Sequence, residues 1–290
     1  MSSHIQRADL LIEALPYIQD FRGYTMVIKY GGSAMDDSSL VVSVLRDIVF
    51  LEAVGINPVV VHGGGKKISA RMQEAGLKPT FVEGLRITDQ QSVNLVDDVL
   101  NNTVNPGIVD EINRLGGRAR SIVGQEVFRA RKAPKVHIGD DEFDLGFVGE
   151  LEGCKLRSVV DAVRDEVVPV ISPLGKDEEG VTYNVNADLA ASEAAVALGA
   201  DKLIYLSDVN GVLRDPEDPE SRIPTIKVSE IAELKEQGVI SGGMIPKLES
   251  CASAIGMGIK KVHLIDGRIP HALLLELFTN QGIGTEIIPA

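Results

Sequence analysis

Short runs of β-branched residues alternate with helical patterns along most of this 290-residue chain. Residues 25–30 (TMVIKY) precede a helical pattern over 38–53, and residues 58–62 (PVVVH) precede another over about 65–75. Strands that alternate with helices in this way form βαβ units, whose parallel strands are buried on both faces of the sheet. The alternation therefore predicts an α/β fold built on a parallel, buried sheet.

The middle of the chain carries two features that interrupt this alternation. Residues 90–115 have a long helical pattern, which Pro106 is expected to kink or split because proline lacks an N–H donor. Residues 118–152 instead have short strand patterns around the acidic turn 139–141, which predicts a β-hairpin that projects from the sheet edge. Such a hairpin could cover a bound ligand.

The second half of the chain returns to strands and helices. Strand patterns occupy residues 167–172, 181–185, 202–206 and 261–265, and helical patterns occupy about 158–164, 187–198, 228–237, 245–257 and 270–279. We place a boundary between two lobes near residues 198–200, where no Pro/Gly/Ser-rich spacer occurs. The predicted organisation is an N-terminal helix over 1–24, a first lobe over 25–198 and a second lobe over 199–290.

Charge and composition exclude several kinds of partner. The chain has 42 acidic and 29 basic residues and a net charge of −13, with no basic run longer than a pair, which disfavours nucleic-acid binding. No apolar run approaches the roughly 20 residues that span a bilayer, so no membrane association is expected. Cys154 and Cys251 form no CxxC motif and no signal-peptide pattern starts the chain, so a cytoplasmic protein with two free thiols is predicted. Because cations are scarce, a Lys or Arg beside a glycine-rich turn is a stronger signal than usual.

Two glycine-rich turns follow consecutive predicted strands. Residues 29–33 (KYGGS) end the first strand, and residues 62–67 (HGGGKK) end the second. Glycine lets phosphate oxygens approach backbone N–H groups, and the dipole of a following helix favours the same anion. A tight turn with a solvated lysine explains either motif alone, but two in consecutive βα units indicate an anion site. Neither motif fits GxxxxGK[ST] or GxGxxG, which disfavours a P-loop protein and a Rossmann oxidoreductase.

Three further polar motifs lie at the ends of strands or helices in the second half. Residues 184–188 (NVNAD) place Asp188 in the first turn of a predicted helix, where capping and the helix dipole alone would explain a carboxylate. Residues 207–211 (SDVNG) follow an apolar strand, and residues 241–247 (SGGMIPK) open another helix. Lys247 lies near the start of that helix, an unfavourable place for a cation unless an anion is bound.

These motifs, in this order, resemble the amino acid kinase family from about residue 25 to the C-terminus. The resemblance implies an open three-layer αβα sandwich with a mainly parallel central sheet. It also implies transfer of the γ-phosphoryl group of ATP, with Mg²⁺ brought by the nucleotide, to a small acceptor. Residues 84–88 (GLRIT) together with 184–188 resemble the members that phosphorylate the side-chain carboxylate of N-acetyl-L-glutamate in arginine biosynthesis.

The resemblance implies a role for each motif residue. Lys29 and Lys247 would stabilise the transferring phosphoryl group while Asp188 holds both lysines in place. The acceptor would be bound by Gly64, Gly65, Arg86, Asn184 and Asn186, with Arg86 on its α-carboxylate. The phosphates and the nucleotide would be bound by Gly31, Gly32, Ser207, Asp208 and Gly243. Acceptor binding and a dimer contact then fall to residues 25–198 and ATP binding to 199–290, and no protein ligand to a metal is predicted.

The first 24 residues form a helical pattern of their own. Ile5, Leu15 and Ile18 share a stripe, which would pack either on its own domain or on another subunit as an oligomerisation arm. The segment resembles the N-terminal helix of arginine-inhibited family members that assemble as a hexamer, a trimer of dimers. That resemblance implies L-arginine as an effector, with contacts from Tyr17, Lys227, His271, Glu276, Gly282 and Gly284. A PII-type signalling protein is a further partner under the same resemblance.

Two other functions stay open on the residues alone. Another carboxylate or carbamate kinase of the family, such as glutamate 5-kinase or aspartokinase, would share the glycine-rich turns but should lack the pairing of 84–88 with 184–188. A nucleotide-binding regulatory protein would need no catalytic residues, so intact Lys29, Asp188 and Lys247 favour an enzyme. Because a carboxylate acceptor has a pKa of about 4.3 and is already ionised, His62 is expected to be structural and not a general base.

Overall fold

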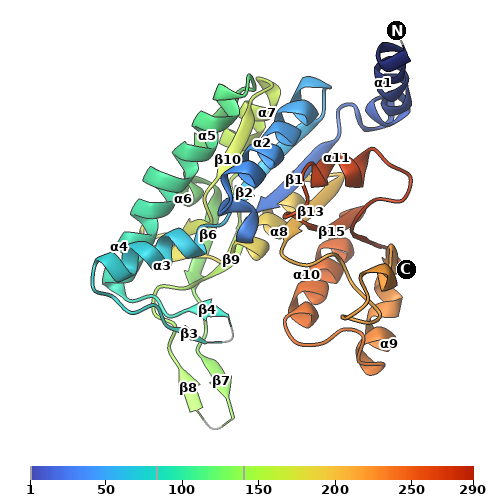
Figure 1. Cartoon of the computed structure of the whole chain (residues 1–290). Helices are drawn as coiled ribbons and strands as arrows, with labels where there is room; N and C mark the ends of the chain where they lie inside the picture. Colours follow the sequence, from blue (N-terminus) through green and yellow to red (C-terminus); the bar gives the residue numbers. More distant parts are fainter. Residues whose placement is uncertain (1, 83, 140) are drawn as a thin grey trace.

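An eight-stranded sheet forms the centre of the structure (Figure 1). The computed structural model describes residues 2–82, 84–139 and 141–290, apart from the side chains of residues 2–4, 6–8 and 10. The strands are β1 (Thr25–Tyr30), β2 (Asn57–His62), β5 (Ala119–Ile122), β10 (Val168–Ile171), β13 (Lys202–Ser207), β14 (Thr225–Lys227), β15 (Lys261–Asp266) and β16 (Thr285–Ile288). Their order is β14-β16-β15-β13-β1-β2-β10-β5, and neighbours are parallel except β15 with β16.

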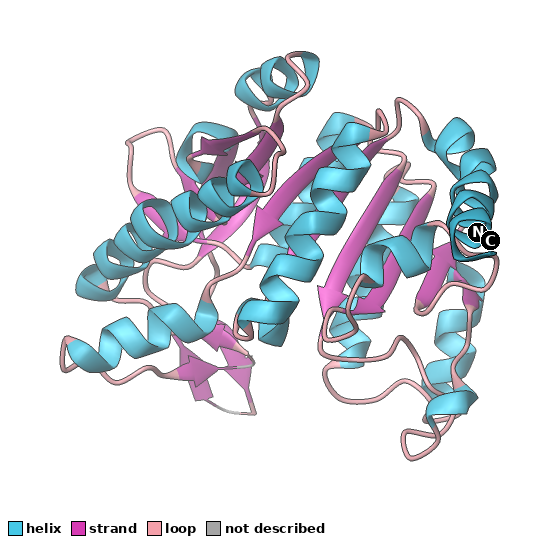
Figure 2. Ribbon diagram, turned by 45° about the horizontal axis from the view of Figure 1, so that its top comes forward, coloured by secondary structure: helices cyan, strands magenta, loops and turns pink. Residues whose placement is uncertain are grey.

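Helices cover both faces of this sheet, as Figure 2 shows. One face packs on α2 (Ser38–Ala53), α3 (Gly65–Glu74), α4 (Gln90–Val99), α5 (Asn105–Arg114) and α11 (Ala272–Leu277). The other packs on α7 (Arg157–Arg164), α8 (Ala187–Leu198), α9 (Ile231–Glu236) and α10 (Met244–Gly256). The predicted three-layer α/β sandwich with a mainly parallel sheet is therefore confirmed.

Strand β1 lies at the centre and contributes to both core layers. Met26 and Ile28 belong to the core on one face, whereas Val27 belongs to the core on the other, as the alternation of side chains along a strand requires. Each core layer also combines residues from both sides of the predicted boundary near 198–200. Sheet and core are thus continuous across that boundary, and the division of functions between 25–198 and 199–290 stays a prediction.

The helical pattern over residues 90–115 is split, as predicted. Helix α4 ends at Val99, a π-helical turn occupies Leu100–Val104, and α5 follows directly. In the turn the N–H of Asn105 donates to the carbonyl of Leu100, five residues back. Pro106 occupies the first turn of α5, where a helix needs no N–H donor.

The predicted projecting hairpin is also present. Strand β7 (Val136–Ile138) pairs antiparallel with β8 (Asp141–Phe143) and extends away from the body of the molecule in Figure 1; Asp140 of the acidic turn lies outside the described residues. A separate four-stranded sheet is formed by β6 (Phe128–Lys132), β9 (Gly149–Cys154), β11 (Leu174–Lys176) and β12 (Thr182–Asn184). One turn of helix, α6 (Gly124–Val127), lies where only strands were predicted. Its first N–H is fixed by the hydroxyl of Ser172 at 2.8 Å.

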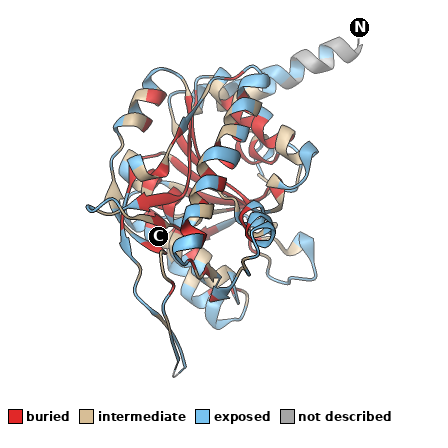
Figure 3. Cartoon of the chain, turned by 90° about the vertical axis from the view of Figure 1, so that its left-hand side faces the viewer, coloured by how far each residue is buried: buried red, intermediate tan, exposed pale blue. Residues whose placement is uncertain are grey.

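The N-terminal segment forms the predicted helix, α1 (Ser2–Phe21), which stands away from the body in Figure 3. At its C-terminal end, Tyr17 and Phe21 pack on Phe278, with 6.1 Å between ring centroids in each pair. Farther out, Leu11 and Ile12 are 71% and 67% exposed. One end of α1 is therefore packed on its own chain, while the other presents apolar side chains to solvent.

Candidate active site

Lys29, Asp188 and Lys247, the three residues predicted as catalytic, lie in contact beyond the carboxyl ends of the central strands. Lys29 is near the end of β1, Asp188 is in the first turn of α8, and Lys247 is in the first turn of α10. The Nζ of Lys29 lies 3.0 Å from Oδ1 of Asp188, and the Nζ of Lys247 lies 3.4 Å from Oδ2. One carboxylate therefore holds two ammonium groups in a common place.

The Asp188 carboxylate is ionised although it is partly buried. Burial opposes ionisation, but the charges of Lys29 and Lys247 outweigh it and lower the pKa of Asp188 below its usual value. The cluster therefore keeps one net positive charge. Capping does not explain Asp188, because the side chain of Asn186 caps α8 by accepting from the N–H groups of Asp188 and Leu189 at 2.8 and 3.2 Å.

The two glycine-rich turns lie together beside this cluster. The N–H of Gly63 donates to the carbonyl of Tyr30 at 2.7 Å, which joins the turn after β2 to the turn after β1. A Cβ on Gly31 would lie 3.0 Å from the Nζ of Lys29. A side chain at residue 31 would therefore crowd the ammonium group, whereas glycine leaves backbone next to it.

Gly32→Ala is expected to destabilise the protein more than the same change at another left-handed glycine. Gly32 has a φ of +71°, and a Cβ there would lie 2.6 Å from Oδ1 of Asp208. The control is Gly76→Ala, because Gly76 has a φ of +75° with nothing within 4 Å of a Cβ, so alanine there costs only the conformational term of about 1–2 kcal/mol.

We expect urea unfolding to show a further loss of about 1–2 kcal/mol for Gly32→Ala, since Asp208 must give up hydrogen bonds. The oxygen concerned accepts from the N–H and the hydroxyl of Ser33 at 2.9 and 2.7 Å. Equal losses in the two variants would mean that Asp208 is not held against the turn.

A cavity of about 270 Å³ opens beside Lys29 and Asp188. Its lining includes every residue predicted to bind the acceptor: Gly64, Gly65, Arg86, Asn184 and Asn186. The cavity is also lined by Phe81, Leu100 and Pro173, which the sequence analysis missed because apolar residues carry no recognisable motif. Since Oδ1 of Asn186 caps α8, only its amide nitrogen is available to a ligand in this cavity.

Arg86 is a buried cation, on strand β4 (Leu85–Arg86) opposite β3 (Phe81–Val82). It is 6% exposed, and in the part of the chain that the structure describes no carboxylate lies within ion-pair distance of it. Its Nη2 donates to the carbonyl of Gly65 at 3.1 Å and to the hydroxyl of Ser69 at 2.9 Å. Burial lowers the pKa of Arg86 below its ordinary value. A buried, unpaired guanidinium is costly, so the cavity fits an anionic ligand.

The residues predicted for the nucleotide come from three places in the fold: the turn after β1, the end of β13 and the start of α10. Ser207 is buried, and its hydroxyl donates to the carbonyl of Ile265 at 3.4 Å. Asp208 accepts from Ser33 and so holds the first glycine-rich turn against the end of β13. Gly243 precedes α10 and has open space around it. Ser33 is therefore a site residue that the sequence analysis missed, although its place directly after the glycine pair was a usable signal.

A second cavity, of about 600 Å³, lies between α1 and the C-terminal segment. Four of the six residues predicted for an effector line it: Tyr17, Glu276, Gly282 and Gly284. Lys227 and His271 do not. The N–H of Lys227 donates to Glu230 at 2.8 Å at the start of a helix, and Nδ1 of His271 lies 2.6 Å from Oδ1 of Asp47.

A buried polar chain in this second cavity was not predicted. The Nζ of Lys202 lies 3.1 Å from Nε2 of His263, whose Nδ1 lies 2.7 Å from Oε1 of Glu276. Burial lowers the pKa of Lys202 to about 8. Lys202 and His263 could not be recognised as site residues from the sequence, because both belong to apolar strand patterns.

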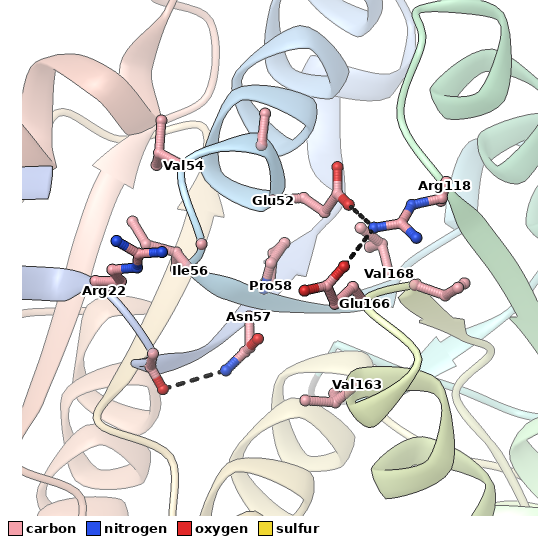
Figure 4. A pocket seen from close by; sticks show the side chains of 14 residues that line it. Arg22, Glu52, Val54, Ile56, Asn57, Pro58, Arg118, Val163, Glu166 and Val168 are labelled. Atoms are coloured by element: carbon pink, nitrogen blue, oxygen red, sulfur yellow. Dashed lines mark hydrogen bonds and ion pairs between the residues drawn. The ribbon is translucent and has the colours of Figure 1, made fainter.

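A further cavity, of about 660 Å³, lies at the amino ends of β1, β2 and β10, the sheet edge opposite the active site (Figure 4). In this cavity Arg118 pairs with Glu52 at 2.9 Å and with Glu166 at 3.1 Å, as the dashed lines show. Among the described residues, none of those predicted for catalysis or binding lines it. We interpret this cavity as a structural feature of the fold that is stabilised by these ion pairs, and not as a ligand site.

Comparison with known proteins identifies the family of this chain. The profile of the amino acid kinase family matches residues 25–266, and the chain belongs to that family. Its similar relatives include an acetylglutamate kinase from Akkermansia muciniphila, 47% identical over 98% of this chain and 96% of that protein. An acetylglutamate kinase from Desulfitobacterium hafniense is 48% identical over 97% of this chain and 96% of that protein.

A solved structure with a similar fold is N-acetylglutamate synthase from Neisseria gonorrhoeae complexed with coenzyme A and N-acetyl-glutamate. It superimposes with a TM-score of 0.82 at 27% identity, over 96% of this chain and 62% of the synthase. The same synthase complexed with coenzyme A and L-arginine gives a TM-score of 0.77 at 26% identity, over 95% of this chain and 64% of the synthase. This chain thus matches just under two thirds of the synthase.

Within the described residues, no group of three or more His, Cys, Asp and Glu side chains is arranged to hold a metal ion. No helix among those residues has both the length and the apolar character to cross a bilayer.

Proposed function

We propose that this protein is a kinase that uses ATP to phosphorylate the side-chain carboxylate of N-acetyl-L-glutamate, giving N-acetyl-L-glutamyl 5-phosphate in arginine biosynthesis. One observation carries the proposal: the buried guanidinium of Arg86 shares a cavity with Lys29 and Asp188. An acceptor with two carboxylates fits such a cavity, because one can pair with Arg86 while the other faces the lysine. Similarity to acetylglutamate kinases over nearly the whole chain supports the choice of acceptor.

The proposed reaction needs alignment and charge compensation and no proton transfer. The acceptor carboxylate, with an ordinary pKa of about 4.3, is ionised at neutral pH. One of its oxygens attacks the γ-phosphorus of ATP, the bond from phosphorus to the β,γ-bridging oxygen breaks, and ADP leaves with that electron pair. Lys29 and Lys247 offset the charge on the transferring group, and Asp188 aligns them without neutralising both.

The residues beside the lysines fit the phosphates of a magnesium nucleotide. Gly31 and Gly64 leave only backbone at positions where a Cβ would lie 3.0 Å from the Nζ of Lys29 and 2.6 Å from the Cδ2 of Leu100, so their N–H groups can approach phosphate oxygens. Mg²⁺, when bound, offsets the charge of the β- and γ-phosphates and takes phosphate oxygens as ligands. Ser207, Asp208 and Gly243 stay the proposed nucleotide residues, with Asp208 acting through Ser33.

A hydroxylamine trap tests this function. Hydroxylamine converts an acyl phosphate into a hydroxamate, which is measured as its coloured ferric complex. We expect ATP-dependent hydroxamate with N-acetyl-L-glutamate and none with L-glutamate, L-aspartate, or bicarbonate plus ammonia. Hydroxamate from L-glutamate alone would refute the N-acetyl acceptor and leave a family kinase. No ATP-dependent hydroxamate with any acceptor would refute a carboxylate kinase.

Arg86→Lys is expected to raise the KM for the acceptor about 10–100-fold, because lysine cannot bind a carboxylate with two parallel hydrogen bonds. The KM for ATP should change less than about threefold, since Arg86 contacts the acceptor only. Arg71→Lys is the matched control, because Arg71 is exposed on α3 and pairs with Glu74 at 3.1 Å. Equal changes in both KM values for Arg86→Lys would remove Arg86 from the acceptor site.

A second proposal concerns assembly and regulation: α1 joins subunits into a hexamer, a trimer of dimers, and L-arginine inhibits by binding beside α1. The exposed apolar side chains Leu11 and Ile12 support an intersubunit contact. The cavity between α1 and the C-terminal segment contains Lys202, Glu276 and Glu286, charges of both signs that suit an amino acid with a cationic side chain. A synthase of similar fold has been solved with L-arginine. A cytoplasmic location and a PII-type partner are proposed from the family resemblance.

Deleting residues 1–22 is expected to turn the hexamer into a dimer and to weaken inhibition by arginine, measured by light scattering and by initial rates. The deletion also removes Tyr17 and Phe21 from the cavity. The double variant Leu11→Asp, Ile12→Asp is therefore the control, because it charges the exposed part of α1 and keeps both cavity residues. It should also give dimers while retaining arginine binding in calorimetry. A hexamer after the deletion would contradict the assembly.

A further inference from the structure

His62 is a buried histidine next to the active-site backbone, and the mechanism above does not use it. It is the last residue of β2, is fully buried, and its Nδ1 lies 2.9 Å from the carbonyl oxygen of Gly63. A carbonyl oxygen only accepts hydrogen bonds, so Nδ1 must carry the proton. Burial lowers the pKa of His62 to about 4, which leaves the ring neutral. In the described part of the chain, Nε2 has no hydrogen-bond partner.

The bond from His62 fixes the direction of the next peptide group. In a planar trans peptide the C=O of Gly63 and the N–H of Gly64 point in opposite directions, and the described chain contains no cis peptide. Holding the oxygen therefore aims the N–H. This N–H has no acceptor among the described residues, and Gly64 lines the cavity that also contains Lys29 and Asp188.

Two other contacts complete this restraint. On the preceding side, the N–H of Gly63 donates to the carbonyl of Tyr30 at 2.7 Å. On the following side, Leu100 closes over Gly64, so that a Cβ on Gly64 would lie 2.6 Å from its Cδ2. Glycine residues have more backbone freedom than any other type, so this peptide needs restraints supplied from outside the turn. Of the three contacts, only the one from His62 depends on a polar side chain.

We propose that His62 is a positioning residue for phosphoryl transfer: its neutral ring donates one hydrogen bond to Gly63 and thereby aims the Gly64 N–H at the oxygens of the transferring group. The inference rests on the proposed kinase function. A general base would accept a proton from the acceptor, but His62 is fully buried and its only observed bond runs to the backbone. The histidine instead acts through the peptide that follows it.

Two substitutions separate the hydrogen bond from the packing of the ring. His62→Asn can place its amide N–H₂ where Nδ1 lies but leaves a void, whereas His62→Leu fills more of the space and has no donor. We expect His62→Leu to lower kcat about 10–100-fold with the KM for both substrates within about threefold of wild type. We expect His62→Asn to keep kcat within about fivefold of wild type.

The two variants should have the opposite order of thermal stability from their order of kcat. Leucine buries apolar surface without an unsatisfied polar group, whereas asparagine leaves a cavity and buried polar atoms, so the melting temperature of His62→Leu should equal or exceed that of His62→Asn. A merely structural histidine predicts that kcat follows the melting temperatures. Equal or higher kcat for His62→Leu than for His62→Asn would overturn the inference.

A measurement on the wild-type protein covers the case in which a variant does not fold. Histidine-selective ¹⁵N NMR should show the His62 ring as the neutral Nδ1–H form between about pH 5.5 and 8; a charged ring or the Nε2–H form would overturn the inference.

The hydroxylamine trap on the wild-type enzyme tests the proposed kinase function separately from the role of His62. No activity would refute the kinase and the role of His62 together, whereas an active enzyme with the reversed kcat order would refute only the role of His62.

Discussion

Replacing Lys29 or Lys247 by alanine is expected to lower kcat about 10²–10³-fold, the cost of removing one preorganised charge that stabilises a transition state. Both ammonium groups contact Asp188, at 3.0 and 3.4 Å. In the proposed reaction both lie beside the path of the phosphoryl group from ATP to the acceptor. During transfer the negative charge lies on the equatorial oxygens of the phosphoryl group. Both lysines therefore stabilise that charge, and neither acts as a base. The KM for each substrate should change less than kcat.

The control for these variants is Lys235→Ala. Lys235 pairs with Glu249 at 3.2 Å and is half exposed, so its loss removes an ion pair without touching the cavity. Initial rates measured by coupled release of ADP, together with thermal melting, distinguish a catalytic loss from unfolding. Turnover close to wild type in Lys29→Ala or in Lys247→Ala would remove that lysine from the mechanism.

Asp188→Asn is expected to lower kcat by about 10²-fold or more, although the two side chains have nearly the same shape. An aspartate offers an acceptor oxygen to each ammonium group, whereas an asparagine amide offers one acceptor and turns a donor toward the other ammonium. Lys29 and Lys247 would then lose their common anchor and repel each other. The exposed Asp165→Asn, which loses an ion pair with Arg120, should keep wild-type turnover. Unchanged kcat in Asp188→Asn would contradict the aligning role of the carboxylate.

The charge of Asp188 should also appear in the pH dependence of stability. Its pKa in the folded protein lies below the usual value, so ionised Asp188 stabilises the fold at every pH above its unfolded pKa of about 3.9. That contribution is lost as the pH falls through the folded-state pKa. The difference in unfolding free energy between wild type and Asp188→Asn should therefore be constant near neutral pH and shrink below about pH 4.

The convergence of the active site could be predicted from sequence because it follows from strand direction. Lys29 lies near the end of one parallel strand and the two glycine-rich turns follow parallel strands, whose carboxyl ends meet at one edge of the sheet. The contact of Lys247 with Asp188 came from the family resemblance, since nothing in their spacing requires two helices to start at the same place. The structure gives that contact a physical basis: the carboxylate offsets the unfavourable position of Lys247 at a helix start.

Other parts of the site depend on packing between distant elements and were not predicted. Leu100, the first residue of the π-turn ahead of Pro106, lies against Gly64, and the sequence pattern predicted the break but not its form. Ser33, which follows β1, reaches Asp208, which follows the neighbouring strand β13. Asn186 was predicted as an acceptor ligand but spends its side-chain oxygen on the cap of α8, a role that its place before a helix also allowed.

A crystal structure with ADP, Mg²⁺, aluminium fluoride and N-acetyl-L-glutamate tests the central claim most directly, because planar aluminium fluoride mimics a phosphoryl group in transfer. We predict that the Nζ atoms of Lys29 and Lys247 lie about 2.7–3.2 Å from fluoride ligands, with Asp188 between them and Arg86 on the α-carboxylate. A fluoride group bound away from both lysines, with the acceptor away from Arg86, would contradict the account.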